Sequence, residues 1–439
     1  MRYVVFLVYL LFALPLRSEA QSTLPQDTTL TLREAIDTAL AQHPTLRVGQ
    51  ATIEAAQQRV RQQLAGYLPR GGYTYTYTRQ QRALSSAVGG VQVGGGQQQR
   101  ATSQLFNFNS TNFSLNQLLF DFGRTLDSIR SALASVEAST ADLETIRQTV
   151  IFNTKQAYYS VLASQRLLKV ADETVQQDQR HLEEAQARFE VGLAPRFDMT
   201  QAQVQLSNAQ LNQVTARNNV ALARETLRTA MGITGAFPFT LVDTLARGDL
   251  TFNDEALLAQ AYANRPELHS IQAQQRATTK QVSALQKQYL PSVSGNAQYN
   301  WTGREYPLQQ GWLWGVTLTF PLFEDILTVS QVGEVQANLR GLQAQEEDLR
   351  QQIALEVRQS FLTLRQAEES IRVSEQTLVQ ARENLDIAEG RYAAGVGNII
   401  ELTDAQVSLT SAQANNVQAL ATYKTAVAQL ERAINQRLE

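Results

Sequence analysis

The chain has no cysteine among its 439 residues. This absence excludes disulfides, thiol chemistry and thiolate metal sites, and also the cysteine that a lipoprotein carries just after its signal. Charge of either sign is scarce, and the formal net charge of −3 argues against a nucleic-acid partner. Beyond the first 20 residues there is no apolar run of about 18 residues, so no further transmembrane helix is expected.

Histidine is rare as well. His43, His181 and His269 lie far apart, without the spacing of a metal site or a catalytic triad, and we interpret them as solvated or capping side chains. The sequence shows no phosphate-binding loop, and its serine-rich stretches have no base nearby. It therefore predicts a protein that is not an enzyme and that holds no cofactor and no metal.

The N-terminus has the pattern of a secretory signal. Arg2 is followed by an uncharged stretch, Tyr3–Leu16, and then by Ser18-Glu19-Ala20, whose small residues suit cleavage before Gln21. The apolar stretch is short for a membrane helix. We therefore expect residues 1–20 to be a signal peptide and the mature chain to be exported. Without another apolar helix, an exported chain enters a membrane only as a closed β-barrel.

The most informative feature that is present is an internal repeat. A shift of 222 positions places Tyr67-Leu68-Pro69 on Tyr289-Leu290-Pro291, and a shift of 203 positions places Arg188 on Arg391 and Gly192 on Gly395. The two offsets differ by 19 residues, which must lie in one loop between residues 78 and 119. The predicted divisions are a first structural repeat at 21–232, a linker at 233–252 and a second repeat at 253–439.

Long helices dominate each repeat. Residues 125–191 contain no glycine or proline, and their apolar residues mostly follow a heptad rhythm. A helix of about 65 residues would span roughly 100 Å, which demands coiled-coil packing. The shorter helical segments flanking each long helix, laid end to end, match it in length. The segments that match are 44–67 with 198–231 in the first repeat and 266–289 with 401–437 in the second, and a further short helix is predicted at 31–43.

Between the short and long helices the apolar period changes to two. Tyr73, Tyr75 and Tyr77 alternate with threonine, and similar stretches lie at 110–120, 292–301 and 312–320. Each has about the length of a tilted strand that crosses a bilayer. We interpret these tyrosines, with Trp301, Trp312 and Trp314, as an interfacial aromatic belt against outer membrane lipid. The alternative is an ordinary soluble hairpin, in which aromatic residues are also common.

Four strands cannot close a barrel, and open edges cannot face lipid, so copies of the chain must pool their strands. Three copies supply twelve strands and leave a lumen. The predicted fold is therefore mainly α with a membrane β-barrel. It combines a long α-helical coiled-coil tunnel with four β-strands per chain, a twelve-stranded barrel in the trimer and an internal two-fold repeat. The residues between paired strands, 79–109 and 302–310, are predicted as exposed loops.

These features resemble the outer membrane efflux protein family, also called the TolC family. The resemblance covers essentially the whole mature chain. It rests on the duplicated helix–strand–strand–helix order, on Tyr-Leu-Pro before each first strand, on Leu-Phe-Asp (119–121) and Leu-Phe-Glu (322–324) after each second strand, and on two helix-hairpin tips. It implies a trimeric barrel in the outer membrane and a periplasmic helical tunnel, with 233–252 in the equatorial region. An inner-membrane transporter and a periplasmic adaptor are the implied partners.

The tips carry the site residues that the resemblance implies. Glu401 and Asp404 match two acidic rings at the pore entrance, although acidic residues at a helix start also complement the helix dipole. Tyr392 and Asp198 match two members of the network that ties neighbouring tips shut. The arginine of that network is absent, with Gly397 in its place, and Arg196 is the substitute that we consider. The expected adaptor-docking residues are Val191, Gly192, Leu193, Ala394, Gly395 and Val396.

The leading functional prediction is an exit duct for small molecules in a tripartite efflux system. One alternative is an outer membrane channel for type I protein secretion. A second, from a different class, is a periplasmic coiled-coil adaptor that forms no channel. The adaptor alternative explains the helices but has no need of four aromatic strands.

Overall fold

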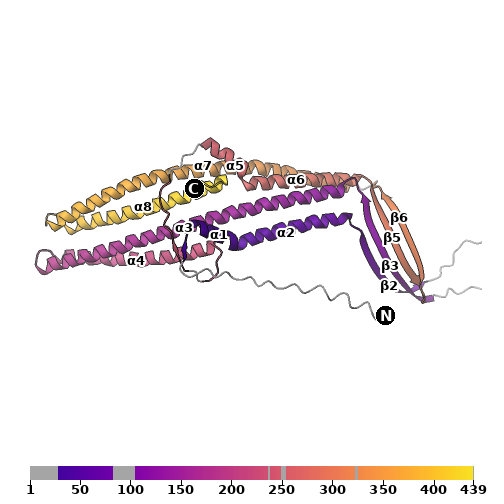
Figure 1. The fold of residues 1–439 in the computed structure, drawn as a ribbon, viewed down its shortest axis with the longest axis horizontal. Helices are drawn as coiled ribbons and strands as arrows, with labels where there is room; N and C mark the ends of the chain where they lie inside the picture. The colour runs from indigo at the N-terminus through magenta and orange to yellow at the C-terminus, as the bar shows by residue number, and fades with distance from the viewer. Residues whose placement is uncertain (1–27, 83–103, 236–237, 249–253, 322–324, 439) are drawn as a thin grey trace, which may run out of the picture.

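The molecule is elongated, with two helical hairpins at one end and a β-sheet at the other (Figure 1). It is a computed structural model that describes residues 28–82, 104–235, 238–248, 254–321 and 325–438. The first repeat contains β1 (Thr28–Leu30), α1 (Leu32–Gln42), α2 (Pro44–Leu64), β2 (Arg70–Arg82), β3 (Gln104–Phe120), α3 (Arg124–Glu190) and α4 (Arg196–Ala230). After β4 (Phe239–Leu241), the second contains α5 (Asp254–Asn264), α6 (Pro266–Gln286), β5 (Ser292–Gly303), β6 (Gln309–Thr319), α7 (Asp325–Ala393) and α8 (Ile399–Ile434).

The predicted long helix is confirmed, because α3 runs for 67 residues and its counterpart α7 for 69. Gly123 precedes α3 in the left-handed region, at φ +80°. Both oxygens of Asp121 accept backbone N–H groups there, from Gly123 at 3.1 Å and from Thr125 at 2.7 Å. These bonds satisfy donors that a helix start leaves unpaired. At the other end Gly192, at φ +78°, ends the helix.

The two hairpins, α3 with α4 and α7 with α8, are built in the same way. Each has a core of leucine and alanine at positions related by the repeat. In the first the core comprises Leu182, Ala185, Ala202 and Leu206, and in the second Leu385, Ala388, Ala405 and Leu409 take the matching positions. Burying a leucine side chain stabilises a fold by about 1.5–3 kcal/mol, so small alanines let the helices approach while the leucines supply most of the energy. Nearer the sheet, α2 and α6 take over the contact with α3.

The sheet has the strand order β2-β3-β5-β6, with antiparallel neighbours. Residues directly opposite one another share a face. One row across the four strands is aromatic: Tyr73, Phe113, Tyr299 and Trp312. The next row, on the other face, holds Thr74, Asn112, Asn300 and Gly311. One apolar face and one polar face are typical of a barrel wall between lipid and an aqueous lumen.

The strands extend further than predicted. β2 continues to Arg82 and β3 begins at Gln104, so the predicted loop 79–109 is strand at both ends, while 83–103 lies outside the described residues. The loop 302–310 is likewise shortened by both strands. Backbone pairing continues past the aromatic alternation, because the ladder bonds do not depend on apolar side chains. Within the described residues, the helices lack a segment apolar and long enough to cross a membrane.

The predicted linker also holds a structural element. β4 pairs in parallel with β1, and Tyr158 of α3 donates its hydroxyl to Val242 at 2.8 Å, which anchors this small sheet on the long helix. The signal at 1–20 lies outside the described residues, and the repeat boundaries stay a prediction.

Candidate functional site at the helical tips

Each hairpin ends in an exposed apolar turn. Val191 and Leu193 are 69% and 80% exposed, and Val396 is 68% exposed. Gly192 and Gly395 have φ of +78° and +73°, and a Cβ added to either would meet no atom within 4 Å. Exposed apolar side chains gathered at one place are a common mark of an interaction surface. Adaptor docking at these residues stays a prediction.

The two acidic residues of the predicted pore entrance both lie near the start of α8. The Asn398 side chain caps the helix by accepting the Glu401 N–H at 2.8 Å. Arg391, at the end of α7, donates its Nε–H to Glu401 at 2.9 Å. Glu401 is thus half of an ion pair, which the sequence did not predict, whereas Asp404 is exposed one turn further on. Their role in a pore-facing ring stays a prediction.

Of the predicted gating residues, the structure brings Tyr392 and Asp198 together. Tyr392 is 6% exposed, and burial, followed by the negative charge of Asp198, raises the pKa of its hydroxyl. Among the described residues, this buried hydroxyl finds no hydrogen-bond partner. Arg196 is exposed at the first position of α4. The described contacts give no support to its role as the substitute arginine.

Arg188, on the last turn of α3, makes the contact between hairpins that sequence reasoning missed. Its guanidinium donates to the carbonyls of Tyr392 at 3.2 Å and Ala393 at 3.4 Å, and lies 4.6 Å from the centre of the Tyr392 ring. Glu184, one turn earlier, holds the guanidinium through two bonds of 2.8 and 3.0 Å. The repeat itself carried a signal, since Arg188 and Arg391 occupy matching positions.

A buried polar contact also joins the two hairpins a few turns from the tips, toward the sheet. Asp178 of α3 is 6% exposed and accepts a hydrogen bond from Gln406 of α8. Burial raises the pKa of Asp178 to about 6. The prediction that His181 is a solvated or capping side chain is wrong. Its side chain is only 15% exposed, and its Nε2 lies 3.8 Å from Glu389 of α7. The neighbouring helices bury the side of α3 that carries Asp178 and His181, and this burial lowers the pKa of His181.

The Asp178 pKa leads to a stability prediction. A folded-state pKa of about 6, above the ordinary 3.8, means that Asp178 destabilises the fold increasingly as pH rises through that range. We expect Asp178→Asn to stabilise the protein by about 3 kcal/mol at pH 8 and to have little effect below pH 4. Chemical denaturation followed by circular dichroism at both pH values measures this. Exposed Asp386→Asn on α7 is the control, and an equal gain at both pH values would contradict the prediction.

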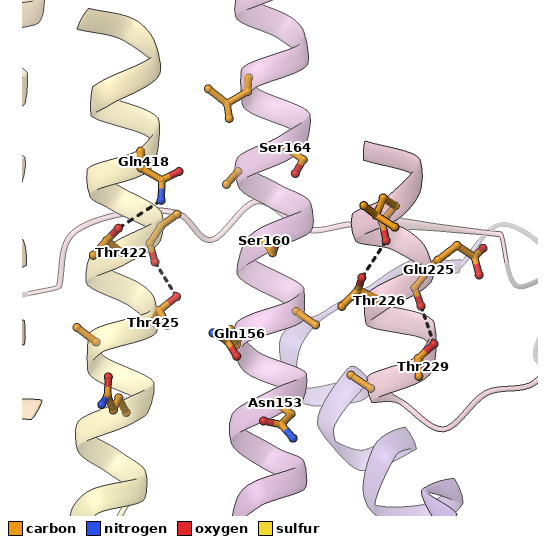
Figure 2. Close-up of a pocket in the computed structure, with 18 of the residues that line it drawn as sticks. Asn153, Gln156, Ser160, Ser164, Glu225, Thr226, Thr229, Gln418, Thr422 and Thr425 are labelled. Atoms are coloured by element: carbon orange, nitrogen blue, oxygen red, sulfur yellow. Dashed lines mark hydrogen bonds between the residues drawn. The ribbon is translucent and has the colours of Figure 1, made fainter. Parts of the chain in front are cut away.

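The open groove between α4, α3 and α8 has a volume of about 1060 Å³ (Figure 2). Its walls carry many neutral hydroxyls and amides. Thr226, Thr229 and Thr425 each donate a hydroxyl to the backbone of their own helix, at 2.9 to 3.0 Å, so they need no partner across the groove. Glu225, the one charged residue among the described lining, pairs with Arg228. Such a wall offers hydrogen bonds without strong charge.

The comparison with known families decides the identity. The sequence model described as outer membrane efflux protein matches residues 35–233 and 257–436. The chain belongs to the outer membrane efflux protein family. Among its relatives, the outer membrane protein TolC of Escherichia coli is 27% identical over 397 residues, covering 85% of this chain and 76% of TolC. Protein CyaE of Bordetella pertussis is 27% identical over 388 residues, covering 86% and 78%.

The fold of this efflux protein is shared with solved structures. The outer membrane protein VceC of Vibrio cholerae superimposes with a TM-score of 0.76 at 19% sequence identity, covering 93% of this chain and 97% of VceC. The efflux protein is therefore an outer membrane channel protein with a periplasmic helical tunnel, and the predicted family, fold class and location are confirmed. Members of this family are channels rather than enzymes.

Proposed function

We propose that the chain is the outer membrane exit duct of a tripartite efflux system. In this role it conducts small molecules passively from the periplasm or an inner-membrane pump to the exterior. The observation that carries the proposal is that one chain joins two parts: a sheet with one aromatic and one polar face, and long helical hairpins whose groove is lined by polar side chains. The groove of Figure 2 favours small polar or amphipathic substrates, because its described lining offers neutral hydroxyls, amides and alanine surface and only one charged residue, Glu225, which pairs with Arg228.

The duct is a homotrimer in this proposal. The described sheet has two open edges, β2 and β6, which cannot remain unpaired in lipid. The helical layer also has two open edges, α4 and α7. Both expose leucines: Leu211 and Leu222 at 66% and 64%, and Leu355 and Leu362 at 67% and 62%. Pairing edge to edge in a closed ring of three covers both sets and completes twelve strands.

The partners in this proposal are a periplasmic adaptor and an inner-membrane transporter. The exposed tips at Gly192 and Gly395 lie at the end farthest from the sheet, where an adaptor reaches them from the periplasm (Figure 1). The chain has no nucleotide-binding motif, so energy must come from the transporter.

Deleting the gene tests the choice between efflux and secretion. Loss of the chain should increase cellular accumulation of a fluorescent dye, while plasmid copies of the parent and of Gly333→Ala should restore efflux. Gly333 is a suitable control because an added Cβ there meets nothing within 4 Å. Unchanged dye accumulation, with loss of a secreted protein from the medium, would instead support type I secretion. Purified protein without conductance in planar bilayers would support the adaptor alternative.

A further inference from the structure

The internal repeat makes the contact between the two hairpins a template for the contact between copies. Within the chain, α3 of the first hairpin packs against α8 of the second. The repeat places α3 on α7 and α4 on α8. The equivalent contact between copies therefore packs α7 of one copy against α4 of the next. This argument rests on the proposed trimer.

Exposed fractions at matched positions agree with this template. In each pair, the residue at the contact between the two hairpins of one chain is buried, whereas its repeat equivalent is exposed. Val417 is 8% exposed and Val214 is 62%; Tyr159 is 4% exposed and Leu362 is 62%; Tyr392 is 6% exposed and Phe189 is 39%. Tyr159 and Val417 belong to one buried cluster. Their equivalents Leu362 and Val214 lie on opposite edges of the chain, so only a second copy can bring them together in the same way.

The same comparison applies to the two tip arginines. Arg188 reaches across to the end of α7, but Arg391 remains within its own hairpin and pairs with Glu401. The acid that holds Arg188, Glu184, is replaced at the matching position by Ile387. The Arg391 and Glu401 side chains are 49% and 44% exposed, and ion pairs this exposed contribute little stability. Arg391 can therefore exchange Glu401 for another acceptor at small cost.

We propose that, in the assembled trimer, Arg391 leaves Glu401 and donates to the carbonyls of Phe189 and Glu190 in a neighbouring copy. These carbonyls match Tyr392 and Ala393, the acceptors of Arg188. The Phe189 carbonyl accepts the Gly192 N–H at 3.0 Å, just as the Tyr392 carbonyl accepts the Gly395 N–H at 3.1 Å and still accepts Arg188, so a carbonyl in this place can take an arginine as a second donor. A positive charge at a helix C-terminus is also favoured by the helix dipole. The Phe189 ring offers Arg391 the stacking surface that Tyr392 offers Arg188. Arg188 and Arg391 then alternate around the ring and hold all hairpin tips together.

Two substitutions with opposite expected effects test the proposal. Single-channel recordings of trimers in planar bilayers measure the time spent at the highest conductance level. Arg391→Ala should increase this time by roughly ten-fold or more, as expected for loss of a charge-assisted hydrogen bond, and Arg188→Ala should change it in the same direction. Glu401→Gln replaces the competing carboxylate with a weaker, uncharged acceptor and should decrease this time. If Arg391 contacts only Glu401, the Arg391 and Glu401 variants will change the time at the highest conductance level in the same direction. That result would overturn the proposal.

Cross-linking provides a readout that does not depend on conductance. Because the chain lacks cysteine, the double variant Arg391→Cys and Glu190→Cys reports a single pair of positions. Oxidation should produce covalent dimers and trimers on denaturing gels. Arg188→Cys with Ala393→Cys should link within one chain and leave the monomer band. A preparation that native mass shows to be trimeric, but that yields no inter-chain product, overturns the Arg391 contact. A monomeric native mass would instead overturn the proposed trimer.

Discussion

Replacing both Gly192 and Gly395 with tryptophan is expected to abolish efflux while leaving trimers in the outer membrane. Both glycines have positive φ, so any side chain costs about 1–2 kcal/mol of backbone strain at each turn. No atom lies within 4 Å of an added Cβ, so the fold has room for the substitution. The turn surface, in contrast, changes completely. Losing a central contact of a docking surface typically weakens binding by roughly 100-fold.

The matched control is alanine at the same two positions. It imposes the same backbone strain but adds only one methyl group to each turn, so it should retain most efflux. The measurements are minimal inhibitory concentrations of exported compounds and the amount of trimer in isolated outer membranes. Normal efflux with tryptophan at both turns would remove the proposed docking site. Loss of efflux with alanine as well would indicate strain rather than docking.

Neutralising the acidic pair with Glu401→Gln and Asp404→Asn is expected to lower cation selectivity several-fold and to remove block by trivalent cations from the periplasmic side. Three copies would place six carboxylates around the entrance, and charged rings of this kind select ions in narrow pores. The effect should weaken at high salt, because the screening length falls from about 10 Å at 0.1 M to about 3 Å at 1 M. Reversal potentials in asymmetric salt measure the selectivity.

The competing explanation is that these residues only complement the dipole of α8. Glu401 lies in the first turn, next to the Asn398 cap, so this explanation has a structural basis. It predicts a slightly less stable helix start and unchanged selectivity and block. Exposed Asp348→Asn, in the half of α7 away from the tip, controls for a general loss of negative charge. Recordings of the double variant that match the parent would decide for the dipole alone.

The sequence by itself determined the main elements of this protein. Without glycine or proline between 125 and 191, the backbone has no reason to leave a helix, and the structure runs uninterrupted from Arg124 to Glu190. The alternation around Tyr73–Tyr77 and the tryptophans of β6 located the strands, because side chains of a strand alternate between its two faces. The tip glycines were found for the same local reason, since a left-handed helix end favours glycine.

Only the tertiary structure decided which side chains meet. Arg188 and Arg391 occupy matching positions, yet one contacts the other hairpin and the other contacts Glu401 in its own. Asp178 and His181 had no sequence signal of burial, because the depth of a helix face depends on the neighbouring helix. A heptad pattern predicts that a face is covered, but the covering residue depends on how two helices far apart in sequence rotate and cross. Pairings between distant segments were therefore decided by packing.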